Sequence, residues 1–285
     1  MKKIVLTSDS TCDLSRELIE RYDIRVIPFN VILGKDTFLD GVNVEPAQLY
    51  EFVSRSGMLP KTAAPGILAY KKFFEKFLDG QTEILHFNIG SKLSAGNQNA
   101  KLAAAELEGV SVIDSASLST GTSLLILKAH DLIQKGKSRE EIEKIIRDIV
   151  PFDQASFCVD KLDYLHKGGR CSGTARFAAN LLHLHPMLQL IDGEIKVVSK
   201  FRGNMSIVFN KYLEFLLEQC PNPDRTRCFV THSDVDKEIV EAAKRFAKEK
   251  FGFEEVFETV AGCTITSHCG KGTLGLLFLN TQPIG

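Results

Sequence analysis

The sequence predicts an α/β protein of two domains: the first with a mostly parallel sheet covered by helices on both faces, the second with a mixed sheet. Three observations support this fold class. Strand and helix patterns alternate from the first residues, the pattern changes beyond Pro151, and Asp192-Gly193 joins two apolar runs as in a tight hairpin. A chain of 285 residues has room for two domains of about 100–200 residues each. We therefore predict domains at 1–152 and 153–285.

The first domain begins with an apolar, β-branched segment at Lys3–Thr7, which predicts a buried strand, followed by a helix at Ser15–Tyr22. Ile24–Leu33 is strand-like, and Pro28 within it indicates an edge or a bend. A proline suits the first turn of the next predicted helix, Pro46–Arg55. The elements predicted after it are a loop at Leu59–Gly66, an amphipathic helix at Ile67–Leu78, a strand at Glu83–Asn88, an Ala-rich helix at Gln98–Leu107, a strand at Val110–Ile113, a helix at Thr120–Gln134 and a helix opened by the capping box Ser138-Arg139-Glu140-Glu141.

The second domain is predicted to contain antiparallel pairing, because Asp192-Gly193 is a strong hairpin signal. The hairpin strands are Met187–Ile191 and Glu194–Ser199. Two helices and three further strands follow, so we predict a mixed sheet. These elements are Met205–Glu218 and Asp236–Phe251 for the helices, and Arg227–Thr231, Glu255–Val260 and Thr273–Leu279 for the strands.

Composition argues against several classes of protein. The net charge is -1 and no dense Lys/Arg run occurs, so nucleic acid is not an expected partner. The apolar run at the start is cut short by Thr7-Ser8-Asp9-Ser10, and no segment approaches the length of a membrane span, so we expect neither a signal peptide nor a span. The odd number of cysteines and the absence of a CxxC pair predict free thiols in a reducing cytoplasm. The seven are Cys12, Cys158, Cys171, Cys220, Cys228, Cys263 and Cys269.

A metal site is not expected. Two arrangements offer metal ligands: the H-x-H pair of His183 and His185, and His268 beside Cys269. Isolated histidines more often cap helices or lie in a core, and clustered Cys pairs are missing. We predict no metal and no cofactor.

Three hydroxyl-rich loops follow predicted strands and precede helices, where ligands bind in open parallel sheets. Free N–H groups at a helix start favour an anion, and hydroxyls add donors. Ser, Thr and Asp are also the preferred N-cap residues, so each loop alone is explained by capping. Three such loops, with Thr62 in a fourth, favour a shared crevice. They are Thr7-Ser8-Asp9-Ser10-Thr11, Gly90-Ser91-Lys92-Leu93-Ser94-Ala95-Gly96 and Asp114-Ser115-Ala116-Ser117.

Two glycine-containing motifs require interpretation. Gly270–Gly275 matches G-x-G-x-x-G, but a strand pattern follows it and the chain ends at Gly285, so we reject dinucleotide binding. Gly272 also stands where a P-loop needs Ser or Thr. The run Tyr164–Arg170 is interpreted either as a tight turn with a solvated arginine or as a turn that directs Arg170 at a cleft between the domains.

Motifs along the chain, each weak alone, are specific in their order and spacing. They are Ser8-Asp9-Ser10-Thr11-Cys12-Asp13-Leu14, Thr62 with Pro65, Ser91-Lys92-Leu93-Ser94-Ala95-Gly96, Asp114-Ser115, Tyr164-Leu165 with Lys167-Gly168-Gly169-Arg170, Pro186-Met187-Leu188, Gly193, Lys200, Arg202, and His268 with Gly270, Gly272 and Thr273. Over essentially its whole length, the chain resembles the DegV family, which includes the fatty-acid-binding B subunits of bacterial fatty acid kinase.

The resemblance implies a two-domain α/β fold with a long-chain fatty acid between the domains. Thr62 and Ser94 are then expected to donate hydrogen bonds to the carboxylate, with Ala95 and His268 in the same site. Arg170 is expected to support this polar network, and a kinase subunit would phosphorylate the carboxylate for phospholipid synthesis. In this interpretation the chain is a carrier and not itself an enzyme.

Arg202 is expected to contact the kinase partner. The sequence departs from the family pattern at Ala63, Gly66, Ala95-Gly96 and Lys271, which puts the fine geometry and the acyl preference in doubt.

Two rival functions remain open. Ser94 with His268 would serve an acyl hydrolase or acyltransferase, although Leu93-Ser94-Ala95-Gly96 lacks the flanks of a G-x-S-x-G elbow. A phosphate- or sugar-binding protein would use the same helix starts, and it predicts a polar pocket in place of a long apolar one.

Overall fold

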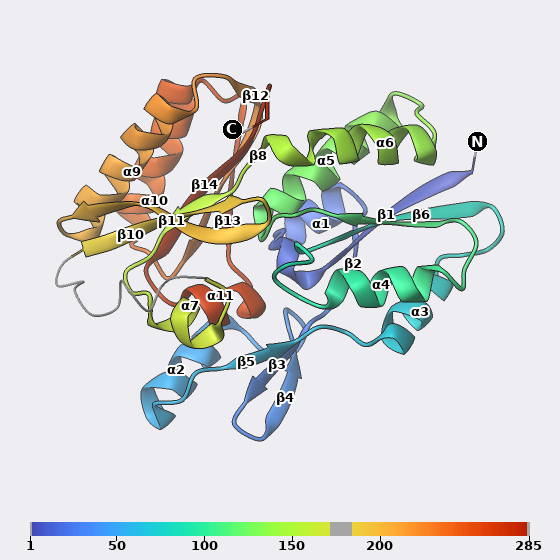
Figure 1. Cartoon of the computed structure of the whole chain (residues 1–285), viewed down its shortest axis with the longest axis horizontal. Coiled ribbons are helices and arrows are strands. Elements are labelled where there is room, and N and C mark those ends of the chain that lie inside the picture. Colours follow the sequence, from blue (N-terminus) through green and yellow to red (C-terminus); the bar gives the residue numbers. More distant parts are fainter. Residues whose placement is uncertain (1, 172–183, 284–285) are drawn as a thin grey trace.

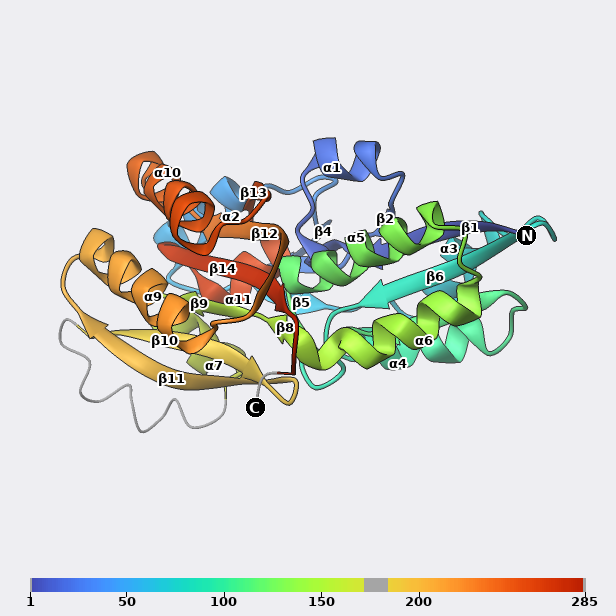
Figure 2. The same ribbon diagram turned by 90° about the horizontal axis from the view of Figure 1, so that it is seen from above.

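The computed structural model describes residues 2–171 and 184–283, which form an α/β structure with three sheets (Figure 1). The strands of the first sheet all precede residue 115, and those of the largest sheet all follow residue 152. Figure 2 shows these two sheets side by side, with helix α5 (Thr120–Gln134) running into their junction. The strands of these two sheets come from separate parts of the sequence, so the structure is compatible with domains at 1–152 and 153–285. This division stays a prediction.

The first sheet is parallel and has helices on both faces, as predicted. Its strand order is β2-β1-β6-β7. Neighbouring residues of a strand point to opposite faces: Phe87 packs with α5 and α6, whereas Ile84 packs with α3 and α4. The elements are β1 (Lys3–Asp9), β2 (Arg25–Ile27), β6 (Thr82–Asn88), β7 (Val110–Asp114), α1 (Arg16–Arg21), α3 (Ile67–Glu75), α4 (Gly96–Ala104) and α6 (Arg139–Ile149).

The largest sheet is mixed, which confirms the prediction for the second half. Its strand order is β11-β10-β9-β14-β12-β13, with β8 beside β14, and β12 and β13 pair in parallel. Asp192 and Gly193 both have positive φ, 53° and 73°, in the predicted turn. The elements are β8 (Asp153–Gln154), β9 (Ser156–Cys158), β10 (Leu184–Ile191), β11 (Glu194–Arg202), β12 (Pro223–Ser233), β13 (Glu255–Val260), β14 (Thr273–Asn280), α9 (Met205–Gln219) and α10 (Lys237–Phe246), which continues to Phe251 as a π-helix.

A small antiparallel sheet, β4-β3-β5, corrects the predicted loop at Leu59–Gly66. Residues Lys61–Ala63 form strand β5 and pair with β3 (Asn30–Leu33), while β4 (Asp36–Leu39) pairs on the other side of β3. A segment of three residues is too short to show an apolar alternation in the sequence. The strand forms because its backbone pairs with that of β3. The predicted strand Ile24–Leu33 is divided at Pro28 into β2 and β3, where the proline indicated a bend.

Three further helices lie near this small sheet and the mixed sheet (Figure 1). Helix α2 (Pro46–Ser56) begins at a proline as predicted. Helices α7 (Asp163–Gly168) and α11 (Cys263–Cys269) are short and pack against each other. The turn expected at Tyr164–Arg170 is therefore a short helix that ends at Gly168 and is capped by Gly169, whose positive φ of 67° is in the left-handed region.

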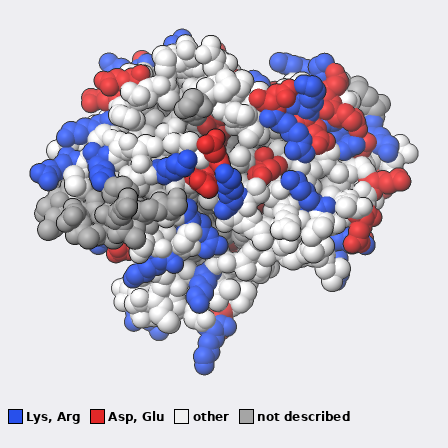
Figure 3. Space-filling view, viewed as in Figure 1, with Lys and Arg blue, Asp and Glu red and all other residues white. Residues whose placement is uncertain are grey.

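The surface carries both signs of charge. Acidic and basic side chains are interspersed over much of the face drawn in Figure 3. Among the described helices, none combines the length and the apolar character that crossing a bilayer requires.

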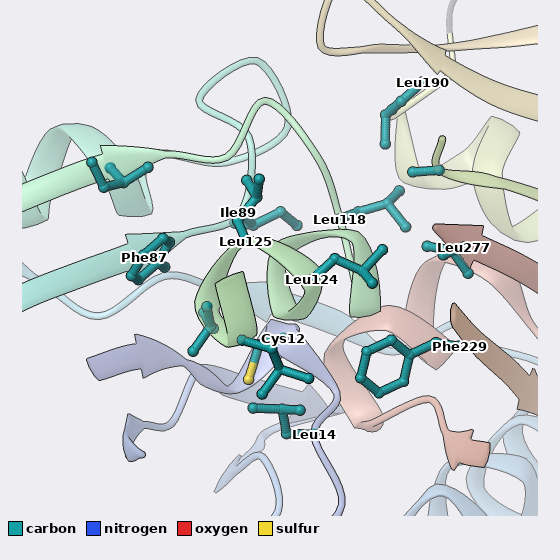
Figure 4. Close-up of a cluster of buried hydrophobic side chains, with 14 of the residues drawn as sticks. Cys12, Leu14, Phe87, Ile89, Leu118, Leu124, Leu125, Leu190, Phe229 and Leu277 are labelled. Atoms are coloured by element: carbon teal, nitrogen blue, oxygen red, sulfur yellow. The ribbon is translucent and has the colours of Figure 1, made fainter. Parts of the chain in front are cut away.

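The main hydrophobic core is shared by both halves of the chain. Figure 4 shows Leu125 of α5 beside Ile89 of the first half, and Leu124 of α5 on the side of Phe229 and Leu277 of the second half. These side chains are all buried and belong to one cluster. The packing of the two sheets therefore does not depend on the connecting residues alone.

Candidate functional site

A cavity of about 290 Å³ lies where the three sheets meet. Its size is close to the lower end of the range for small-molecule sites, about 300–1,000 Å³. Much of the lining is apolar and comes from both halves of the chain. It includes Phe29, Ile89, Leu93, Phe157, Leu165 and Leu277.

Five of the six residues predicted for the site line this cavity. Thr62, Ser94, Ala95, Arg170 and His268 come from four separate segments of the chain. Ser94, Ala95 and Arg170 also line a second hollow on the surface, so the two hollows adjoin there. The polar end of the cavity therefore lies next to the outside.

Thr62 and His268 form the central polar contact. Thr62 Oγ1 lies 2.8 Å from His268 Nε2, although the residues are 206 positions apart in the sequence. Thr62 is on β5 opposite Val31, and His268 is in the last turn of α11. The unpredicted strand and the unpredicted helix thus position the two side chains.

Two buried carboxylates fix the start of α11. Asp40 accepts hydrogen bonds from the backbone N–H groups of Cys263 at 2.8 Å and Thr264 at 3.1 Å. Asp13 accepts one from Gly262 at 2.8 Å. The free N–H groups of a helix start are thereby satisfied, and negative charge is favourable there. Since both acids belong to the first half, they fix His268 relative to Thr62.

Gly168 leaves room for the imidazole ring of His268, because it has no side chain. A Cβ added to Gly168 would lie 2.7 Å from His268 Nδ1, and one added to Gly270 would lie 2.7 Å from the Tyr164 ring. Helices α7 and α11 therefore approach too closely for larger side chains. This explains in physical terms why glycine is required in the run Tyr164–Arg170.

His268 is neutral at physiological pH. Burial, together with the nearby positive charge of Arg170, lowers its pKa from 6.5 to about 4. Arg170 itself is exposed, and its Nη1 donates to the Gly168 carbonyl at 2.6 Å. The site thus combines a neutral imidazole with a cation at its edge.

Ser94 and Ala95 immediately precede helix α4. Ser94 Oγ accepts a hydrogen bond from the Gly96 N–H at 3.2 Å, and Ala95 is the N-cap residue. Ser94 is therefore not the N-cap residue of α4, whose start has no side-chain cap, and its hydroxyl hydrogen remains available to a ligand.

Arg202 is not among the residues that line the cavity. It ends β11 opposite Leu184 and is exposed, and its carbonyl accepts a hydrogen bond from Lys211 Nζ at 3.2 Å. A role for Arg202 in partner contact stays a prediction.

The hydrolase interpretation needs a serine activated by an oriented base. No hydrogen bond joins Ser94 to His268 within residues 2–171 and 184–283, and His268 Nδ1 has no partner there. A group that would orient the imidazole as a general base is therefore missing from this part of the chain.

Metal ligands do not gather in the described part of the chain, where no three His, Cys, Asp or Glu side chains form a cluster suited to an ion. Of the H-x-H pair, His183 lies outside the described residues, and His185 Nδ1 lies 3.5 Å from Asp160 Oδ1. Cys269, beside His268, is buried.

Sequence reasoning missed several polar residues of the cavity wall. Ser119, Thr231, His232 and Thr264 all line it. Thr231 Oγ1 lies 2.6 Å from Thr120 Oγ1 and 2.9 Å from Thr259 Oγ1. Isolated hydroxyls in strands and helices carry no sequence signal, so a motif search could not have found them.

Fold and site together define an α/β protein with a largely apolar cavity that is also lined by Thr62, Ser94 and His268. The family model described as "Uncharacterised protein, DegV family" matches residues 3–281. The chain therefore belongs to the DegV family.

Related proteins align with nearly the whole of this chain. A DegV domain-containing protein of Clostridium acetobutylicum is 31% identical over 98% of this chain and 99% of its own. A fatty acid-binding protein of Thermotoga maritima is 30% identical over 96% of each chain. A fatty-acid-binding DegV family protein of Thermus thermophilus has a structure with a TM-score of 0.90, 28% identity, and coverage of 98% of this chain and 100% of that chain.

Proposed function

We propose that this chain binds a long-chain fatty acid in the cavity, with the carboxylate held by Thr62, Ser94, the region of Ala95, and His268. The observation that carries the proposal is the Thr62–His268 contact at the polar end of an apolar cavity. The fatty-acid binding described for the Thermotoga and Thermus relatives supports it.

The hydrocarbon tail provides most of the binding energy. A palmitate-like chain has some 14 methylenes, each worth roughly 0.8 kcal/mol when buried, or about 11 kcal/mol before the costs of association. The carboxylate must still be hydrogen-bonded when it leaves water. Its contacts therefore set the orientation of the ligand more than its affinity.

The hydrogen-bond direction between His268 and Thr62 follows from this role. When His268 Nε2 carries the proton, it donates to Thr62 Oγ1, and the threonine hydroxyl is free to donate to the carboxylate. The other tautomer would use the threonine hydrogen for the imidazole. A bound acid therefore favours the proton on Nε2.

We infer further that the chain presents the carboxylate to a separate kinase, which forms an acyl phosphate for phospholipid synthesis. The carboxylate end adjoins the surface hollow lined by Ser94, Ala95 and Arg170, so a partner can approach it there. Arg202 is proposed to contact that partner. The seven free, buried cysteines support a cytoplasmic location.

Mass spectrometry of a solvent extract from the purified protein tests the ligand. A stoichiometric fatty acid is expected, and a delipidated sample should bind added palmitic acid. An empty extract with no palmitic acid binding would contradict the proposal. Release of free acid from an ester substrate would support the hydrolase instead.

The kinase step has its own test. With ATP and a bacterial fatty acid kinase subunit, the loaded protein should yield acyl phosphate, trapped by hydroxylamine as a hydroxamate. Arg202→Ala should reduce turnover while palmitic acid binding is unchanged. Turnover unaffected by the substitution would remove Arg202 from the partner surface.

A further inference from the structure

The cavity wall contains a buried hydroxyl without a protein partner. Thr264 is 3% exposed and lines the cavity, and its Oγ1 makes no hydrogen bond to any group in residues 2–171 and 184–283. Most buried polar side chains in native structures are hydrogen-bonded, since an unpaired one is costly. In the wall of an apolar cavity, such a hydroxyl indicates a polar group on the ligand.

The position of Thr264 on α11 places it close to the proposed head-group site. Thr264 and His268 are four residues apart, so they lie on the same side of the helix one turn from each other. The backbone N–H of Thr264 donates to Asp40 Oδ2, which fixes the helix start beneath the side chain. The Thr264 hydroxyl therefore faces the first part of an acyl chain whose carboxylate contacts His268.

We propose that the cavity prefers fatty acids that carry a hydroxyl close to the carboxyl group, the 3-hydroxy fatty acids, and that Thr264 determines this specificity. A hydroxyl is both a donor and an acceptor, so it can pair with the Thr264 hydroxyl in either direction. An unsubstituted chain leaves Thr264 unpaired. This inference rests on the proposed fatty-acid function and names the class of acid bound.

The test measures the Kd values of delipidated full-length protein for palmitic, 3-hydroxypalmitic and 16-hydroxypalmitic acid by displacement of a fluorescent fatty acid. Both enantiomers of the 3-hydroxy acid are used. We expect one of them to bind about tenfold more tightly than palmitic acid, the order for one hydrogen bond. The 16-hydroxy acid should bind no better than palmitic acid.

Thr264→Val keeps the shape of the side chain and removes the hydroxyl. It should reduce affinity for the 3-hydroxy acid by about tenfold and leave palmitic acid binding unchanged or tighter. Thr264→Ser is the matched control, because it keeps the hydroxyl and should keep the preference.

The outcomes separate the two proposals. If the wild type binds none of the acids, the fatty-acid function fails. If it binds palmitic acid but prefers neither 3-hydroxy enantiomer, only the specificity inference fails. Equal loss of both acids in Thr264→Val would assign Thr264 to the carboxylate site and overturn the inference. If that variant does not fold, the wild-type preferences still decide.

Discussion

At the scale of single residues, the neutral imidazole of His268 distinguishes this site from an ion-pair site. Burial keeps the pKa of His268 at about 4, and Thr62 Oγ1 is the hydrogen-bond partner of its Nε2 at 2.8 Å. In the proposed complex the carboxylate would be held by hydroxyl and N–H donors, while Arg170 would contribute charge from an exposed position. Hydrogen-bond donors define the orientation of the acid without a buried counter-ion.

The proposed head-group site predicts pH-independent binding near neutrality. His268 keeps one protonation state between pH 6 and 8, because its folded pKa of about 4 lies below this range. The Kd for palmitic acid should therefore change less than about twofold across it. An imidazolium counter-ion would instead lose affinity as pH rises through about 6.5. Isothermal titration at four pH values checks this.

Ser94→Ala should weaken palmitic acid binding by roughly 1–3 kcal/mol, the usual cost of removing a hydrogen bond to a charged group. Because Ser94 also accepts from the Gly96 N–H, the melting temperature must be measured alongside the Kd. Ser91→Ala is the control, since Ser91 lies on the outer hollow and does not line the cavity. Unchanged affinity in Ser94→Ala would exclude Ser94 from the head-group site.

At the scale of elements, α11 depends on contacts far away in the sequence. Its residues Cys-Thr-Ile-Thr-Ser-His-Cys include β-branched side chains, which disfavour helix formation. The buried carboxylates of Asp13 and Asp40 satisfy its first N–H groups and so compensate. The helix that carries His268 is therefore stabilised by the first half of the chain.

Asp40→Asn should destabilise the protein by about 1–3 kcal/mol and weaken palmitic acid binding. Each carboxylate oxygen of Asp40 accepts a backbone N–H, and an amide nitrogen cannot replace one of them. Asp36→Asn, at an exposed position of β4, is the matched control. Chemical denaturation and ligand titration measure the two effects, and normal values for both in Asp40→Asn would contradict the role given to this residue.

Elements that are stabilised by neighbouring residues could be predicted from the sequence, whereas elements that are stabilised by distant residues could not. Helix α5 was predicted at its observed bounds, and the capping box of α6 and the Asp192-Gly193 turn are local signals that the structure confirms. Strand β5 and helix α11 were not predicted, because their hydrogen bonds come from β3 and from Asp13 and Asp40. The site residues became recognisable only through the combined family motifs, while Thr264 belongs to no motif.

At the scale of the whole molecule, the buried carboxyl group of Asp153 lies at the junction of the halves. Asp153 on β8 is buried, and its Oδ1 has no partner among the described residues. Helix α5 approaches it so closely that a Cβ on Gly121 would lie 2.6 Å from Asp153 Oδ2. Burial raises the Asp153 pKa from 3.8 to about 7, and a hydrogen bond from Ser117 opposes the shift.

Asp153 should make the folded state less stable as the pH rises. Between pH 3.8 and about 7 the folded carboxyl keeps its proton while the unfolded one loses it, so the folded state binds more protons and stability falls with increasing pH. Asp153→Asn removes this penalty and should raise the free energy of unfolding at pH 8 on the order of 1–4 kcal/mol.

The gain in Asp153→Asn should shrink towards pH 4, because the unfolded-state carboxyl approaches its own pKa of 3.8 there and is partly protonated, like the folded one. Urea denaturation at pH 4, 6 and 8 gives the comparison, and Asp148→Asn, at an exposed position of α6, provides the control. An Asp153→Asn variant that is less stable than wild type at pH 8 would show that the ionised carboxylate stabilises the junction.

The long separation of the α11 contacts has a consequence for biosynthesis. Asp40 precedes its partner Cys263 by 223 residues, and Asp13 precedes Gly262 by 249. At roughly 5–20 residues per second, a ribosome needs about 10–45 s to synthesise the chain between Asp40 and Cys263. During that interval the nascent protein has no α11, so the proposed head-group site, which needs His268, is incomplete until translation has passed that helix.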